Sequence, residues 1–212
     1  MRLDPANPGH RRAAADLVLT LFPESPAALL GRRFLEQFYF ADLVSGGLME
    51  CLLYFDGAIP VGFGLFTADP FGFIAKGSKK HFFKLGSLVA LQILIRPTRV
   101  ATLFNVLRQG GYRSGKDKKD VRPLGELLTF GVLESHRKMV DPESGEKIST
   151  FLFKESFRRL KANGVEVVQL VAFRDNLAAQ TFFKKCGGVE DPDGYLYQNT
   201  NVLKFDLGKL GY

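Results

Sequence analysis

The chain has 212 residues, of which 46% are hydrophobic and 24% charged, and its net charge is +7. This composition is typical of a globular protein with one substantial core, and it excludes collagen-like and low-complexity chains. Two cysteines, Cys51 and Cys186, are too few for a disulfide framework, and the three histidines show no metal-ligand spacing. We therefore expect reduced thiols and no metal. Residues 1–12 lack the apolar core of a signal peptide, which predicts a cytoplasmic location.

The positive charge is concentrated in one segment of the chain. Residues 76–122 carry twelve Lys/Arg and two Asp, a balance of +10, whereas the rest carries 17 basic and 20 acidic residues. A protein that binds nucleic acid through its main fold usually has basic residues on that fold. The distribution therefore argues against a general nucleic-acid-binding protein.

Two helices are predicted at the start of the chain. Apolar residues recur at helical spacing in residues 11–22, and Pro23 ends this pattern. A second, longer pattern covers residues 27–44 and ends at Ser45-Gly46-Gly47. The chain therefore opens with two consecutive helices.

A β-hairpin is predicted next. Residues 48–55 and 58–67 read as strands, and Asp56-Gly57 between them is a dipeptide typical of tight hairpin turns. Gly62 and Gly64 in the second strand predict a bulge or the close approach of another part of the chain.

The segment from about residue 70 to 122 differs in character and is predicted to be a helical insertion. Residues 82–95 are very apolar but too few to span a bilayer, which needs about 20 residues. Residues 99–109 predict a further helix, and residues 113–122 a basic loop. Three interpretations remain open. The insertion is a helical lid, or a dimer interface or hydrophobic acceptor pocket, or a peripheral contact with an anionic membrane surface.

The last third of the chain predicts strand, loop, helix, strand, helix and strand in that order. The corresponding residues are 126–134, 144–147, 148–163, 165–173, 175–186 and 195–207. A glycine-bearing loop that opens a helix after a strand is a natural pocket for phosphate, because free backbone N–H groups and the helix dipole both attract an anion.

This order of elements resembles that of the GCN5-related N-acetyltransferase (GNAT) superfamily, which transfers an acyl group from acyl-coenzyme A to an amine. The most specific similarity is Asp175-Asn176, Ala179 and Phe182 to Gly187, which resemble the family's Asn-x-x-Ala-x-x-x-Tyr-x-Lys-x-Gly signature. The resemblance implies a single α/β domain over residues 1–212. Its core would be a mixed, twisted sheet flanked by helices, with the insertion at about residues 70–122.

The resemblance also implies acetyl-coenzyme A, or another acyl-coenzyme A, as co-substrate. The implied contacts are Phe130, Gly131, Val132, Leu133, Arg137, Gly145, Glu146, Lys147, Ile148, Ser149, Thr150, Asn176, Ala179, Phe182, Phe183 and Lys185. The phosphate loop departs from the family pattern, since Gly145 is its only glycine and Lys147 stands where a second is expected. An ordinary surface turn, a helix cap at Asn176 and a core role for the two phenylalanines are the alternative interpretations.

The catalytic groups are likewise implied by the resemblance. Glu126 stands where the family has a strand glutamate that accepts the proton of the amine through water, and its alternative is a solvated carboxylate. Phe183 occupies the position of the usual tyrosine acid and has no proton to donate. The thiolate would then be protonated by solvent, or by Tyr197 or Tyr195 from the tail of the chain.

The sequence therefore predicts an N-acyltransferase, most often an acetyltransferase, that acts on a primary amine. The acceptor is expected to be a small molecule, for example an amino sugar or a lipid-linked intermediate. A homodimer and peripheral contact with the inner face of the membrane remain open. One alternative is a non-catalytic GNAT-like module that binds acyl-coenzyme A or a protein. Another is a membrane-surface or nucleic-acid-binding protein that acts through the basic insertion.

Overall fold

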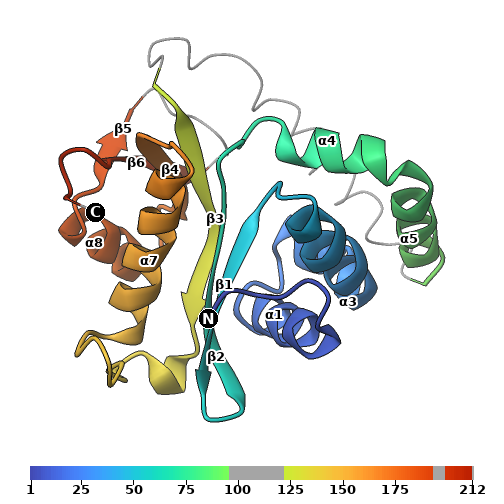
Figure 1. The fold of residues 1–212 in the computed structure, drawn as a ribbon, viewed down its shortest axis with the longest axis horizontal. Helices are drawn as coiled ribbons and strands as arrows, with labels where there is room; N and C mark the ends of the chain where they lie inside the picture. The colour runs from blue at the N-terminus through green and yellow to red at the C-terminus, as the bar shows by residue number, and fades with distance from the viewer. Residues whose placement is uncertain (96–121, 193–198, 212) are drawn as a thin grey trace.

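The computed structural model describes residues 1–95, 122–192 and 199–211, and it contains a mixed six-stranded sheet covered by helices on both faces (Figure 1). The strand order is β1-β2-β3-β4-β6-β5, and only β3 and β4 run parallel. The strands are β1 Glu50–Asp56, β2 Ile59–Thr67, β3 Leu124–Val132, β4 Val167–Phe173, β5 Val189–Asp191 and β6 Thr200–Asp206.

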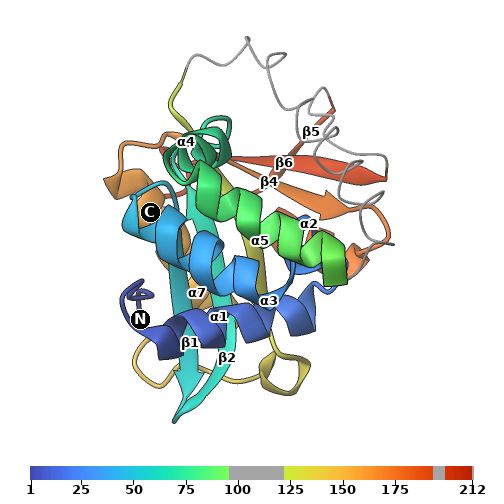
Figure 2. The ribbon, with the colours of Figure 1, turned by 90° about the vertical axis from the view of Figure 1, so that its right-hand side faces the viewer.

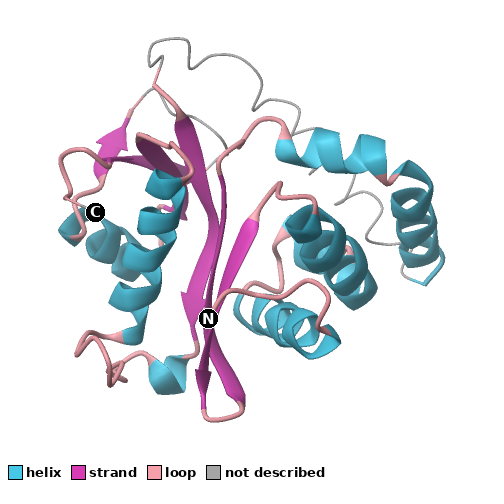
Figure 3. Cartoon of the chain, viewed as in Figure 1, coloured by secondary structure: helices cyan, strands magenta, loops and turns pink. Residues whose placement is uncertain are grey.

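One face of the sheet carries the helices that precede β3, and the other carries those that follow it (Figures 1 and 3). The first group is α1 Pro8–Leu21, α2 Pro26–Leu29, α3 Gly31–Phe34, η1 Leu35–Leu43, α4 Phe73–Lys80 and α5 Phe82–Ile95. The second group is α7 Ile148–Ala162 and α8 Leu177–Lys185, and the short turn η4 Glu134–His136 precedes α7.

Two hydrophobic clusters result, one on each face of the sheet. Along β1, Cys51 and Leu53 are buried against α1 and η1, whereas Leu52 between them belongs to the cluster under α7. This alternation is the period-two pattern of a strand with both faces covered. The sheet is therefore packed against a hydrophobic cluster on each of its two faces.

Most of the predicted elements are confirmed. The α/β class, both hairpin strands, the three elements β3, α7 and β4, and the helix over residues 82–95 are present. The single helix predicted over residues 27–44 is wrong. Gly31, with φ of +84°, separates α2 from α3, and residues 35–43 are wound as a wider π-helix.

The strand β5 was not predicted, because it is only three residues long. The predicted helix at residues 99–109 and residues 113–121 of the predicted basic loop lie outside the described residues. Within the part that the structure describes, no helix is both long and apolar enough to cross a membrane.

The predicted close approach at Gly62 and Gly64 is confirmed. A Cβ placed on Gly64 would lie 2.7 Å from Ser156 Oγ of α7, and one on Gly62 would lie 3.0 Å from Leu152 Cδ1. Ser156 is fully buried, and its hydroxyl donates to the carbonyl of Leu152 at 2.8 Å. The absence of a side chain at Gly62 and Gly64 therefore lets α7 pack closely on this part of β2.

We expect Gly64→Ala to lower the free energy of unfolding by about 1–3 kcal/mol, because the added methyl group overpacks this contact. Chemical denaturation measures the change, and Ser156→Ala in the same chain should recover part of it. Gly86→Ala is the matched control, since nothing lies within 4 Å of a Cβ at that exposed position of α5. Equal effects at both glycines would contradict the proposed close packing.

Candidate functional site

The parallel strands β3 and β4 separate halfway along their length. They pair over Leu124–Leu127 and Val167–Leu170 only. Beyond these residues β3 continues along β2 to Val132, and β4 continues along β6 to Phe173. Two strand edges thus face each other without a ladder among the described residues, so backbone groups are available to an extended ligand.

A β-bulge lies at the point of separation. The register between β2 and β3 shifts there, since Leu65 faces Thr129 while Phe66 faces Leu127, which leaves Leu128 as the extra residue. A bulge bends its strand and increases the local twist. This bend accounts for the departure of β3 from β4 directly after Leu127.

Glu126 lies one residue before the separation and is buried, with 2% of its surface exposed. It faces Gln169 across the β3–β4 pair, and Gln169 Nε2 donates to Glu126 Oε2 at 3.1 Å. The interpretation of Glu126 as a solvated carboxylate is therefore wrong. The hydrogen bond from Gln169 orients the carboxylate at the strand opening, where it can act as a proton acceptor.

The side chain of Glu126 projects to the face opposite α7. Its neighbour Gly125 faces α7, because a Cβ there would lie 3.0 Å from Leu160 Cδ2. Successive residues of a strand point to opposite faces. The carboxylate therefore lies on the sheet face away from α7 and α8.

Glu126 and Gln169 belong to a row of polar residues that crosses four strands. The direct cross-strand neighbours in this row are Thr67, Glu126, Gln169 and Lys204, and Lys204 Nζ lies 2.8 Å from Asp191 Oδ2 of β5. Sequence reasoning missed Gln169. A signal was available, because Gln169 is the one polar residue within the apolar run 167–173.

The loop between β3 and α7 is organised by Asp141. Its main-chain N–H donates to Glu146 O at 2.7 Å, its carbonyl accepts from Gly145 N at 2.9 Å, and its Oδ2 accepts from Ser144 N at 2.7 Å. Gly145 has φ of +69°, a conformation that favours glycine. The irregular loop is therefore a defined turn and not a glycine-rich cradle.

Tyr54 of β1 attaches this turn to the sheet, a contact that sequence reasoning did not find. Its hydroxyl donates to Asp141 Oδ1 at 2.6 Å. Burial, followed by this hydrogen bond, raises the pKa of Tyr54 to about 12, while the hydrogen bonds from Tyr54 and Ser144 lower the pKa of Asp141. At neutral pH the pair is thus a protonated phenol donating to a carboxylate.

Fewer amides are available to a phosphate than the sequence predicted. Those of Gly145, Glu146 and Ile148 are already bonded, to Asp141 O, Ser144 Oγ and Met139 O. The amides of Lys147, Ser149 and Thr150 make no hydrogen bond within the described residues. The N-terminus of α7, which is the positive end of the helix dipole, adjoins this turn. No side chain caps it at Lys147, so no side-chain oxygen satisfies its first amides.

The charges around the turn suit an anion. Glu146, whose carboxylate would repel a phosphate, is ion-paired with Lys154 of α7. Arg137 and Lys147 are exposed, and neither side chain makes an ion pair or hydrogen bond within the described residues. Two cationic side chains and three main-chain amides are therefore available to bind an anion such as pyrophosphate.

The residues implied on α8 divide between the core and the surface. Asn176 Oδ1 accepts from Ala179 N at 3.1 Å, so its side chain oxygen caps the helix. Phe183 is buried in the cluster under α7, and Phe182 stacks on Phe130 of β3 with ring centroids 5.9 Å apart. Lys185 is exposed. The Phe130–Phe182 stack lies between β3 and α8, on the α7 side of the gap.

Other implied positions line the end of β3. Gly131 faces α1, where a Cβ would lie 3.0 Å from Leu21 Cδ1, Val132 is buried on the α7 side, and the amide of Leu133 donates to Val61 O at 2.8 Å. Tyr197 and Tyr195 lie outside the described residues. Burial raises the pKa of both cysteine thiols, which disfavours the reactive thiolate.

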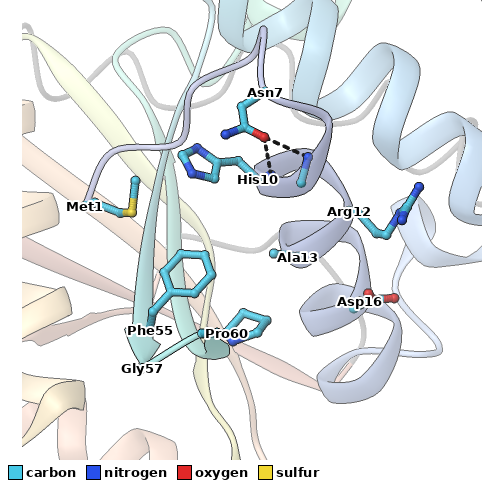
Figure 4. Close-up of a pocket in the computed structure, with 11 residues that line it drawn as sticks. Met1, Asn7, His10, Arg12, Ala13, Asp16, Phe55, Gly57 and Pro60 are labelled. Carbon is cyan, nitrogen blue, oxygen red and sulfur yellow. Dashed lines mark hydrogen bonds between the residues drawn. The ribbon is translucent and has the colours of Figure 1, made fainter.

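A separate hollow of about 560 Å³ lies between the start of α1 and the β1–β2 turn (Figure 4). Its lining includes His10, Phe55 and Pro60, while Asn7 is engaged as the cap of α1. Pro60 and Thr67, the neighbour of Glu126, are at opposite ends of β2, about 20 Å apart. This hollow is therefore distant from Glu126. No cluster that could hold a metal ion occurs among the described residues.

We expect Tyr54→Phe to lower the free energy of unfolding by about 1–2 kcal/mol at neutral pH, because Asp141 loses a donor. The lowered pKa of Asp141 stabilises the fold above the ordinary carboxyl pKa of about 3.9, and this contribution disappears as the pH falls through the folded-state value. The difference between variant and parent should therefore shrink on acidification. Urea unfolding from pH 7 to pH 3 measures it, and a difference independent of pH would contradict the assignment.

No family model and no curated protein matches the sequence. Ninety solved protein chains match the structure. NAA60 of Arabidopsis thaliana, solved with acetyl-CoA, has a TM-score of 0.53 at 15% identity and covers 98% of this chain and 97% of its own. The PaiA N-acetyltransferase of Thermoplasma acidophilum, solved with coenzyme A, has a TM-score of 0.50 at 11% identity, with 96% and 92% covered.

FeeM, an N-acyl amino acid synthase from uncultured soil microbes, has a TM-score of 0.53 at 14% identity and covers 99% of this chain and 90% of its own. An acetyltransferase of the GNAT family from Streptococcus pneumoniae also reaches 0.53, at 13% identity, with 97% and 96% covered. At these identities the likeness concerns the fold. The chain therefore has the fold of these acetyltransferase structures, at sequence identities of 11–15%.

Proposed function

We propose that the protein is an acyl-coenzyme A-dependent N-acyltransferase that holds the acyl donor in the gap between β3 and β4. The observation that carries this proposal is the buried carboxylate of Glu126 at the point where the two strands separate. The gap offers backbone groups to an extended chain. The segment of residues 137–150 at the start of α7, here called the α7 turn, offers amides and cations to a pyrophosphate. Structures of the same fold solved with coenzyme A and acetyl-CoA support the same cofactor.

In the proposed reaction a primary amine attacks the thioester carbonyl carbon. A C–N bond forms, the C–S bond breaks, and the coenzyme A thiolate leaves. Glu126 accepts the proton of the amine, directly or through one water molecule. The backbone of residues 130–132 would polarise the thioester carbonyl, since the amide of Leu133 is already bonded to Val61 O.

The leaving thiolate takes its proton from solvent or from a tyrosine of the tail. Phe183, at the position of the family's usual acid, has no proton to give and is packed in the core. Tyr197 and Tyr195 remain the proposed side-chain acids. Tyr54 is unsuitable, because its raised pKa and its bond to Asp141 hold its proton.

Donor and acceptor would reach the sheet from opposite faces. The α7 turn and α8 lie on one face, whereas Glu126 projects to the other, which carries the helices before β3. We therefore propose a small primary amine as the acceptor, such as an amino sugar or a lipid-linked intermediate. The acyl group is proposed to be acetyl.

A non-catalytic module that binds acyl-coenzyme A is the second candidate. The core position of Phe183 and the shortage of free amides in the α7 turn favour it. Glu126, with its donor Gln169, favours the enzyme. The two proposals share coenzyme A binding and differ in turnover.

Calorimetric titration with acetyl-CoA and with desulfo-coenzyme A tests the shared step. We expect both to bind and to raise the melting temperature, because a ligand that binds only the folded state stabilises it. If neither gives heat nor stabilises the protein, both candidates are wrong.

Glu126→Gln then separates the enzyme from the module. The variant keeps the size of the side chain and an acceptor for Gln169, and we expect its kcat to fall about 100–10,000-fold with acetyl-CoA binding unchanged. Glu166→Gln is the matched control, because Glu166 is exposed just before β4 and should tolerate the change. Turnover that is equal in both variants and the parent would remove Glu126 from the mechanism.

A further inference from the structure

We propose that the corner between α4 and α5 docks on an anionic membrane surface. This corner consists of residues 79–84, in which two lysines are followed by His81, two phenylalanines and Lys84. It lies at the outer side of the helices that precede β3, beyond η1 (Figures 1 and 2). The proposal is independent of the acyl-transfer reaction.

Two consecutive phenylalanines are presented to solvent at this corner. Phe82 is 68% exposed and Phe83 is 89% exposed, and their rings contact each other edge-on with centroids 5.7 Å apart. Phenylalanine is usually among the most buried residues. An exposed aromatic pair is therefore evidence of a surface that is covered in use.

Helix α4 adds two further apolar side chains. Phe71, just before the helix, is 51% exposed, and Ile74 in its first turn is 41% exposed. Phe73 and Gly77 form the buried side of the helix. Exposed apolar side chains therefore occur at both ends of α4.

The cations of the corner suit an anionic surface. Lys79 and Lys80 in the last turn of α4 are exposed, and neither makes an ion pair or hydrogen bond within the described residues. The sequence contains no acidic residue from residue 70 to residue 90. Lysines beside exposed aromatic side chains are typical of segments that lie in the interface of an anionic bilayer.

Contacts with η1 also fix the corner in place. Asp42 of η1 lies 2.7 Å from Lys84 Nζ and 3.7 Å from His81 Nδ1, and Lys84 Nζ also donates to Gln37 O at 2.8 Å. These contacts direct Lys84 and His81 inward, toward η1. The phenylalanines are therefore presented by an anchored turn.

A membrane fits this surface better than a second copy of the chain. A symmetric dimer through the corner would bring its unpaired lysines close to those of the partner, with no acidic residue in the segment to compensate. Lipid headgroups supply the negative charge, and the acyl region receives the phenylalanine rings.

Vesicle flotation tests the proposal at low salt. The full-length chain is mixed with vesicles of phosphatidylcholine alone, or of phosphatidylcholine and phosphatidylglycerol in equal parts. We expect binding to the anionic vesicles only, and weaker binding as salt is added.

Two double variants locate the surface. Phe82→Ser with Phe83→Ser, and Lys79→Glu with Lys80→Glu, should each reduce partition about tenfold or more, since each lysine near an anionic surface contributes about fivefold. Phe173→Ser, which removes another exposed phenylalanine, and Lys138→Glu with Lys209→Glu, which changes the charge equally, are the matched controls and should bind like the parent. All altered side chains are exposed, so circular dichroism melting should show every variant folded.

Several results would overturn the proposal. One is absence of binding to anionic vesicles by the folded parent, and another is equal loss of binding in the corner variants and their controls. The parent could instead be dimeric by light scattering, become monomeric when Phe82 and Phe83 are replaced, and fail to bind vesicles. That result would assign the corner to contact with a second copy of the chain. Binding to nucleic acid without binding to vesicles would equally reject the membrane.

Discussion

The separation of β3 from β4 after Leu127 and Leu170 is the constraint on which the candidate site depends. The bulge at Leu128 bends β3, which stays paired with β2, while β4 stays paired with β6. Each strand therefore keeps one partner, and the sheet opens without losing its order. In such a gap a ligand can hydrogen-bond to main-chain N–H and C=O groups, so its binding does not depend on particular side chains.

The same β3–α7–β4 unit positions the other parts of the site. Its first strand carries Glu126, and its second strand carries Gln169. The amides of Lys147, Ser149 and Thr150, which are not bonded within the described residues, lie at the start of α7. Gly64 and Ser156 bring α7 close to the sheet, and the Tyr54–Asp141 hydrogen bond ties the turn to β1. The positions of the carboxylate and of the turn before α7 are thus both set by this packed unit.

Local patterns in the sequence predicted most of the helices and strands, whereas contacts between residues far apart in the chain could not be predicted from it. The predicted elements include α7 and β4, and the glycines of β2 predicted the close approach of another element. Tyr54 and Asp141 are 87 residues apart, and nothing local links them. The sequence indicates only the position of Glu126 at the start of an apolar strand, because its burial and its contact with Gln169 depend on how β3 and β4 pair. The π-type winding of η1 could not be predicted either, because its apolar residues fit an ordinary helix equally well.

Amide hydrogen exchange with and without coenzyme A tests most directly whether the gap is the cofactor site. We predict that coenzyme A slows exchange at residues 128–132 of β3, at residues 171–173 of β4 and at Ser149 and Thr150, and leaves the β1–β2 turn unchanged. Protection confined to other parts of the chain, with these amides exchanging as in the free protein, would contradict the assignment.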